Sequence, residues 1–277
     1  MVPQGRLIII GNAKLKTTGK SETVSANNFP SREIVDFLTE YKTDRIEVIT
    51  AGSATEDMQG KCSGVFSEIG FNNFGFIHIS EDNVNENYLL NRLSEAKTVF
   101  FIGDQSRTYE VLKNSGILRH LYKKYLFENG FTIAGLNLGA MCIPGVMMCD
   151  TMNNENMELA PGLGFLNNCI VDAQFEQTTF KKLVYTVIQN REFLGVGLGE
   201  NTALIVNNGF LATCKGSGAV VIVDAKDVRQ EHVDLVMKGS SVFAERMKGH
   251  VLTHGRVINL RSGEIHHHMN NFQTTYL

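Results

Sequence analysis

The chain contains the segment Phe131-Thr132-Ile133-Ala134-Gly135-Leu136-Asn137-Leu138-Gly139-Ala140, in which an apolar run leads into a Gly-x-Asn-x-Gly turn. The apolar run predicts a buried strand, and the small-residue segment Met141–Met148 that follows is expected to begin a helix. A sharp turn between a strand and a helix is the shape of a nucleophile elbow, which lifts one side chain above the sheet edge. Reactive elbows hold Ser or Cys at the middle position. Here that position holds Asn137, whose carboxamide is not activated as a nucleophile in the usual way.

Apolar, strand-like runs alternate with helical patterns on both sides of this segment. Further strands are expected at Leu7–Ile10, Arg45–Thr50, Phe74–Ile79, Thr98–Ile102, Ile170–Phe175, Ala203–Val206, Ala219–Val223 and Val251–Leu260. Helices are expected after an N-cap at Ser31 and at Glu56–Ile69, Asn87–Ala96, Arg107–Asn129 and Phe180–Asn190. This alternation predicts an α/β fold with a mostly parallel sheet flanked by helices, and extra strands in the C-terminal third. Asn208-Gly209 is a hairpin signal. No composition break marks a linker, so a single domain spanning residues 1–277 is expected.

Composition excludes several classes of protein. The 277 residues are 43% hydrophobic and 20% charged, which is typical of soluble globular proteins. A net charge of −3 gives no electrostatic reason to expect nucleic acid or an anionic membrane as a partner. No apolar run approaches the ~20 residues that a membrane span needs, and the N-terminus lacks the features of a signal peptide. Five scattered cysteines without zinc-ligand spacing predict reduced thiols, and we expect a cytoplasmic protein.

Six blocks of the chain resemble, in order, the cyanophycinase and peptidase E group of serine hydrolases, over roughly residues 5 to 225. The blocks are Gly5–Gly11, Thr50–Ser53, Phe101–Gln105, Gly135–Ala140, Ile170–Phe175 and Gly197–Leu204. They resemble an opening strand and glycine, Thr-Ala-x-Ser, Gly-Gly-Asp-Gln, Gly-Thr-Ser-Ala-Gly-Ala, Val-Asp-Gln-His-Phe and Gly-x-Asp-Glu-Asn-Thr-Ala-Leu. Each block alone is a weak pattern, whereas six in order are specific. The resemblance implies a class I glutamine-amidotransferase-like α/β fold and a homodimer.

The resemblance also implies roles for individual residues. Asn137 stands at the nucleophile position, Gln174 at the histidine position and Glu200 at the acidic position. The implied ligand-binding residues are Gly103, Asp104, Gln105, Leu138 and Asp172. A catalytic triad needs a hydroxyl, an imidazole and a carboxylate, and only the carboxylate candidate remains.

Further departures from the family pattern surround these positions. Ala173 replaces a glutamine, and Ile102 replaces the first glycine of Gly-Gly-Asp-Gln. Lys14-Leu15-Lys16 replaces an acidic Glu-Asp-Lys.

Each position has more than one reading. Asn137 either binds a ligand or simply fits the turn, because Asn tolerates positive φ better than most residues. Neutral amides at both Asn137 and Gln174 favour a retained polar pocket, although Ala173 removes a polar wall. Glu200 is either a ligand contact for a cationic group or a capped carboxylate at a strand start. Asp104, Gln105 and Arg107 follow a strand end, where α/β sheets bind ligands, but they could equally make loop hydrogen bonds.

Other candidate sites are weaker. Cys142 lies about one and a half helical turns past Asn137, so a buried hydrophobe is favoured over a relocated nucleophile. His266-His267-His268 cannot all face one metal site on a strand, so a solvated run is favoured. Gly11-Asn12-Ala13-Lys14 lacks the glycine spacing of nucleotide-binding loops. We therefore expect no cofactor and no metal.

Two function hypotheses remain open. In the first, the chain is a non-catalytic homologue that binds a peptide or amino acid above Asn137, Gln174 and Glu200, or serves as a partner subunit. In the second, it is a hydrolase with altered chemistry. The resemblance then implies cleavage at aspartyl residues, as in the β-linked aspartyl-arginine units of cyanophycin. The missing Ser and His favour the first hypothesis.

Overall fold

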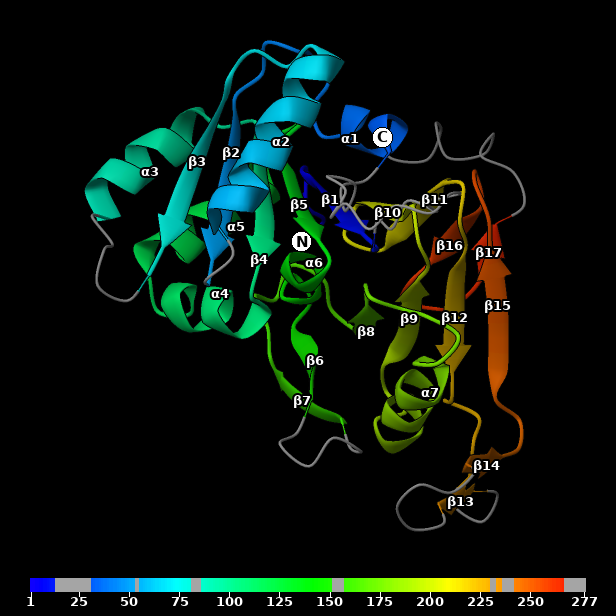
Figure 1. Ribbon diagram of the computed structural model, residues 1–277. Coiled ribbons are helices and arrows are strands. Elements are labelled where there is room, and N and C mark those ends of the chain that lie inside the picture. Colours follow the sequence, from blue (N-terminus) through cyan, green and yellow to red (C-terminus); the bar gives the residue numbers. More distant parts are fainter. Residues whose placement is uncertain are drawn as a thin grey trace.

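A computed structural model describes residues 1–12, 31–52, 55–80, 86–150, 157–229, 233–235 and 242–266 (Figure 1). The helices within these ranges are α1 (Arg32–Asp36), α2 (Thr55–Ile69), α3 (Glu86–Glu95), α4 (Gln105–Leu112), α5 (Gly116–Phe127), α6 (Leu138–Met141) and α7 (Phe180–Gln189). None of these described helices combines the length and the apolar character that a membrane crossing needs.

The largest sheet has nine described strands. In spatial order they are β17 (Ile265–His266), β16 (Val257–Asn259), β11 (Leu211–Gly216), β10 (Thr202–Asn207), β1 (Arg6–Ile10), β5 (Thr132–Leu136), β4 (Thr98–Gly103), β2 (Ile46–Ala51) and β3 (Phe74–Ile79). From β1 to β3 all neighbours are parallel, whereas β10, β11, β16 and β17 pair antiparallel. Figure 1 shows α4 and α6 at the end of the sheet toward which the arrows of β2, β4 and β5 point.

Both faces of the parallel strands are buried, and alternate residues of each strand serve opposite faces. On β1, Leu7 and Ile9 belong to one core, which includes apolar residues of α3, α4, α5 and α7. Ile8 and Ile10 belong to the other core, which includes apolar residues of α1 and α2. Side chains of a strand alternate between faces, so a continuous apolar run such as Leu7–Ile10 requires cover on both sides. The helices supply that cover.

A second sheet of four described strands extends the first core. Its order is β15 (Lys248–Leu252), β12 (Val220–Asp224), β9 (Leu194–Leu198) and β8 (Cys169–Asp172), and α7 packs against β9 and β12 (Figure 1). Two further pairs are β6 (Val146–Asp150) with β7 (Met157–Pro161), and β13 (Val233–Leu235) with β14 (Val242–Ala244). All five cysteines lie in described residues and are free.

The predicted fold class is confirmed: an α/β fold around a large, mostly parallel sheet flanked by helices, with extra C-terminal strands. The Asn208-Gly209 hairpin is also present, with φ of 56° and 75° at its two central residues. It joins β10 to β11, a strand that the prediction missed, and not to the strand expected at Ala219–Val223. The strand at Val220–Asp224 pairs with β9 in the other sheet.

Several predicted boundaries were wrong. The helix expected over Arg107–Asn129 is two helices, because the Ser115 side chain accepts the Leu118 N–H and caps a new start at α5. The segment Met141–Met148 is largely not helical. The helix α6 ends at Met141 and β6 begins at Val146, since Pro144 lacks an N–H and disfavours helical geometry at the residue before it.

Three smaller corrections concern strand ends and a cap. The strand expected over Ile170–Phe175 ends at Asp172. The strand expected over Val251–Leu260 is divided into β15 and β16 by a turn in which Gly255 has a φ of 81°. Ser31 precedes α1, but its side chain makes no capping hydrogen bond; its backbone N–H instead donates to Asn201 Oδ1 at 3.1 Å.

A buried ion cluster ties β2 to α3. Glu47 on β2 is completely buried, and its carboxylate accepts hydrogen bonds from Arg45 at 2.6 Å and from Arg92 of α3. Gly75 on β3 leaves room for the two guanidinium groups, since an added Cβ would lie 2.5 and 2.6 Å from their nitrogens. A buried carboxylate is tolerated only when it is paired and hydrogen-bonded.

We predict that Arg92→Ala lowers the free energy of unfolding by about 3 kcal/mol, because it leaves a buried carboxylate with half of its cationic partners. Chemical denaturation measures the effect. The matched control is Arg32→Ala, which removes an exposed ion pair with Glu68 and should change stability by less than about 1 kcal/mol. Equal effects of the two substitutions would contradict this assignment.

Candidate functional site

The predicted elbow is present at the end of β5. Asn137 has φ 53° and ψ −121°, and its backbone N–H donates to the Ile10 carbonyl at 3.1 Å. Its own carbonyl accepts the N–H groups of Ala140 at 2.9 Å and Met141 at 3.1 Å, which starts α6. Left-handed φ in a non-glycine residue costs energy and persists only when the surroundings enforce it. The chain therefore makes an abrupt strand-to-helix turn at Asn137.

Two glycines allow this turn by bringing backbones into contact. A Cβ added to Gly135 would lie 2.4 Å from the Gly139 carbonyl oxygen. A Cβ added to Gly139 would lie 2.3 Å from the Phe101 carbonyl oxygen on β4. Real Cβ atoms do not come so close, so any larger residue would push α6 away from β4 and β5. The Gly-x-Asn-x-Gly pattern thus places the elbow beside the Phe101–Gln105 block.

The Asn137 side chain is half-buried and partly engaged. Its Nδ2 donates a long hydrogen bond, 3.5 Å, to Asn12 Oδ1. Its Oδ1 is buried and has no hydrogen-bond partner among the residues that the structure describes. A buried amide oxygen without a partner is costly. The elbow therefore holds one buried acceptor whose hydrogen bond no described residue makes.

Asn12 is a site residue that the sequence prediction missed. It follows β1 at the same sheet edge as Asn137, and its carbonyl accepts the Asn201 N–H at 2.8 Å. Gly11 lies so close to the next block that an added Cβ would be 2.7 Å from the Gly199 carbonyl oxygen. A polar residue directly after an apolar strand, at the edge where α/β folds bind ligands, was the available signal.

Glu200 lies next to this contact, and its carboxylate makes no hydrogen bond or ion pair with a described residue. Its backbone carbonyl accepts the Thr202 hydroxyl at 3.0 Å, and its residue is half-exposed. The neighbouring Asn201 holds the block in place. Asn201 has a φ of 51°, and its side chain bonds the Ser31 N–H and the Ser217 hydroxyl. The structure thus places the Gly197–Leu204 block beside Asn12.

Gln174 follows β8 and is exposed, whereas Asp172, at the strand's end, is buried. Asp172 Oδ1 accepts the Gln174 N–H at 3.0 Å, and its Oδ2 accepts the Thr179 hydroxyl at 3.4 Å. This carboxylate therefore holds the turn that carries Gln174. The helix α6 contacts β8, the strand that precedes this turn. No hydrogen bond among the described residues joins the side chains of Gln174 and Asn137.

The Gly103–Gln105 block forms the start of α4. Gly103 has a φ of 111°, and the Asp104 carboxylate caps α4 by accepting the Arg107 N–H at 2.8 Å. Gln105 is 8% exposed, and its Nε2 donates to the Met148 carbonyl on β6 at 2.7 Å. Its Oε1 is buried without a partner among the described residues. Asp104 thus has a structural role, and Gln105 offers a second buried acceptor.

The structure describes some of the remaining predicted residues, and others lie outside the described ranges. Leu138 is half-buried at the first position of α6. Cys142 is fully buried, its thiol donates to the Gly139 carbonyl, and burial raises the pKa of that thiol, so it is not a nucleophile. Lys14-Leu15-Lys16, Ser53, His267 and His268 lie outside the described residues. Elsewhere in the described chain no group of three or more His, Cys, Asp or Glu residues could hold a metal ion.

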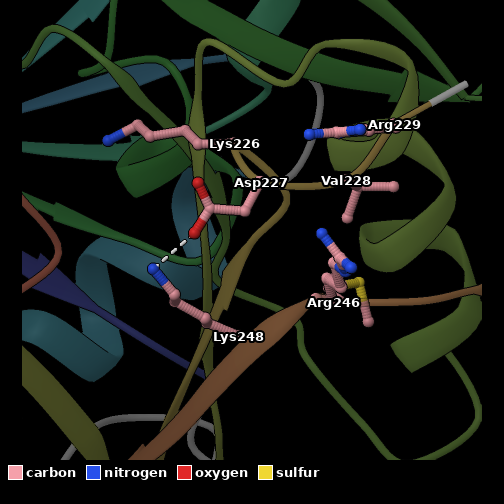
Figure 2. A pocket seen from close by; sticks show the side chains of 7 residues that line it. Lys226, Asp227, Val228, Arg229, Arg246 and Lys248 are labelled. Carbon is pink, nitrogen blue, oxygen red and sulfur yellow. Dashed lines mark ion pairs between the residues drawn. The ribbon is translucent and has the colours of Figure 1, made fainter.

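A hollow of about 590 Å³ lies elsewhere and contains none of the predicted site residues. Figure 2 shows its ion pair between Lys248 and Asp227, at 2.6 Å, with Arg229 and Arg246 beside Val228. The hydrogen bond from Lys248 holds the pKa of Asp227 below its ordinary value. The lining side chains are mostly exposed, so water screens their charges.

We predict that Gly139→Ala lowers the free energy of unfolding by about 2–3 kcal/mol, because α6 must move away from the β4 backbone. Thermal or chemical denaturation measures the loss. Gly64→Ala in α2 is the control: an added Cβ there meets nothing within 4 Å. It should stabilise the protein by about 0.5–1 kcal/mol, as expected for a helical glycine. If Gly139→Ala left the free energy of unfolding unchanged, the contact between α6 and β4 would be looser than described.

Known proteins are similar to this chain in sequence. The chain matches peptidase family S51 over residues 7–213. It is 28% identical to cyanophycinase of Synechococcus elongatus over 234 residues, which covers 80% of this chain and 71% of the relative. It is 24% identical to cyanophycinase of Trichormus variabilis over 204 residues, covering 71% of this chain and 68% of the relative.

A similar fold occurs in a solved structure, a protein from Listeria monocytogenes described as a peptidase E. The TM-score is 0.50 at 11% identity, and the match covers 67% of this chain and 92% of that one. Because the family match includes β1, the elbow, β8 and the Gly197–Leu204 block, the chain belongs to peptidase family S51.

Proposed function

We propose that this member of a peptidase family binds a peptide or amino-acid ligand at the elbow without cleaving it. The observation that carries the proposal is Asn137 itself. It holds the left-handed backbone of a nucleophile elbow, presents a carboxamide, and keeps a buried Oδ1 without a described partner. An amide donates and accepts hydrogen bonds well but performs no acid–base or nucleophilic chemistry.

The chemistry of the neighbouring positions supports binding over catalysis. Gln174 stands where the family pattern has histidine, so no imidazole takes a proton there. Loss of both nucleophile and base removes a covalent route. The amides that line this edge, Asn12, Asn137 and Gln105, are suited to the backbone groups of a peptide, which each carry one donor and one acceptor.

The alternative is a hydrolase with altered chemistry, acting on aspartyl or cyanophycin-like peptides. Membership of a peptidase family favours it, and Glu200 retains the acidic position. Such an enzyme would need a nucleophile other than Asn137. Cys142 does not meet that need because it is buried.

We predict that the wild-type protein binds β-aspartyl-arginine dipeptide and leaves it intact during prolonged incubation. Calorimetry measures binding, and chromatography measures products. Asn137→Gly should weaken binding about tenfold, because it removes one buried hydrogen bond while glycine keeps the positive φ.

The control is Asn129→Gly, which should bind normally. Asn129 is exposed and precedes Gly130 in the turn between α5 and β5. Turnover that requires Asn137 would contradict the proposal. Turnover that survives both Asn137→Gly and Glu200→Ala would place the active centre elsewhere.

We also predict that Asn137→Ser alone remains inactive on cyanophycin, whereas Asn137→Ser combined with Gln174→His gains hydrolysis about 10²-fold or more above wild type. The reason is that a serine hydroxyl needs a base to accept its proton. Release of aspartyl-arginine dipeptide measures the gain. Equal activity of the single and double variants would contradict a role for position 174 as the family's base.

A further inference from the structure

A second hollow lies at the carboxyl ends of β2 and β3, beside the first turns of α4. It has a volume of about 530 Å³, and we name it the β2–α4 hollow. Its lining residues are Gly52, His78, Ile79, Ser80, Ser106, Arg107, Glu110 and Val111. Arg107 was named above as a candidate that follows a strand end; Asn137, Gln174 and Glu200 do not line this hollow. A hollow of this size suits a small molecule.

The position of the hollow follows from the topology. Helix α2 leaves β2 on one face of the sheet, where its Phe66 joins the core of Phe100. Helix α4 leaves β4 on the other face, where its Leu112 joins the core of Phe101. Connections that diverge from adjacent parallel strands open a crevice at the carboxyl edge, and α/β sheets bind ligands in such crevices.

The lining offers one strong anchor for an anionic group. Arg107 is exposed, and its guanidinium makes no hydrogen bond or ion pair with any described residue. Gly52, with a φ of 92°, lies beside the arginine stem, where an added Cβ would be in ordinary van der Waals contact with Arg107 Cδ at 3.8 Å. A free guanidinium binds carboxylates through two parallel hydrogen bonds.

Polar groups surround this anchor. Ser80 and Ser106 carry hydroxyls, and the exposed His78 has its Nδ1 3.4 Å from Thr50 Oγ1, while its Nε2 has no described partner. Ile79 and Val111 add apolar surface. A few convergent polar groups on a partly apolar lining are typical of small-molecule sites.

The balance of charge selects the kind of ligand. The positive charge of Arg107 is opposed by Glu110, which lies one helical turn further along α4. The Asp104 carboxylate adds a second negative charge at the start of this helix. Glu110 pairs with Lys113 through Oε2, which leaves Oε1 for a second cation. The lining is therefore not strongly cationic, so it does not favour a multiply charged anion such as phosphate. It suits a molecule with one carboxylate and one ammonium group.

We propose that the β2–α4 hollow binds a small zwitterionic carboxylate, a free amino acid or dipeptide, with its carboxylate on Arg107 and its ammonium group toward Glu110. The proposal does not rest on the elbow function. Arg107→Ala therefore tests this site without altering the elbow residue Asn137.

The test is calorimetric titration of the full chain with glycylglycine, N-acetylglycine and inorganic phosphate. Glycylglycine should bind, and N-acetylglycine, which keeps the carboxylate but lacks the ammonium group, should bind several-fold more weakly. Arg107→Ala should weaken glycylglycine binding about tenfold or more. Arg119→Ala, which removes an exposed arginine on α5, should bind like wild type. Thermal melting confirms that each variant is folded.

Other outcomes would overturn the proposal. Absence of glycylglycine binding at millimolar concentration would refute the site. Binding that is unchanged in Arg107→Ala, or that falls equally in Arg119→Ala, would assign the ligand to another place. Phosphate that binds as tightly as glycylglycine and depends equally on Arg107 would refute the zwitterion and leave a simple anion site.

Discussion

The contact of α6 with the backbone of β4 and β5 is the constraint on which the elbow depends. Gly135 and Gly139 bring peptide groups so close that neither position accepts a Cβ. The turn between them must then be abrupt, and Asn137 takes a left-handed backbone conformation within it. With a ψ of −121°, Asn137 lies outside the left-handed helical region that asparagine adopts most readily, so the close contacts on both sides must hold it in this conformation.

This geometry gathers distant parts of the chain at one sheet edge. The end of β1 supplies Asn12, the start of α4 supplies Gln105, and the block after β9 lies against Gly11. Amides dominate this edge, and burial keeps the pKa of the Cys142 thiol raised and its sulfur unreactive. These amides donate and accept hydrogen bonds, which agrees with the proposed ligand-binding role.

Sequence patterns predicted the parts of this structure that depend on periodicity and turn chemistry. The strand over Phe74–Ile79 and the stop of α2 at Gly70, with a φ of 95°, follow from local preference. Leu7–Ile10 indicated a doubly covered strand, and the Gly-x-Asn-x-Gly pattern indicated the elbow. These features are encoded by neighbouring residues, so a single sequence suffices to find them.

Features that depend on contacts between distant segments were not predictable in the same way. The break between α4 and α5 depends on a cap by Ser115 within a pattern that otherwise continues as one helix. The role of Asn12 depends on its meeting with Asn137, 125 positions away in the chain. Asp172 was expected to contact a ligand, yet its carboxylate also holds the turn before Gln174. Asp104 likewise caps a helix.

The proposed function requires that Asn137 contacts a bound ligand and that the ligand is not cleaved. The most direct measurement is a nitrogen–proton correlation spectrum of the Asn137 side-chain amide during titration with β-aspartyl-arginine dipeptide, with the dipeptide's own signals followed in the same tube. The account predicts that the Asn137 amide signals shift to a saturating endpoint while the dipeptide stays intact. Signals that do not move at saturating ligand, or a dipeptide that disappears as free amino acids accumulate, would contradict it.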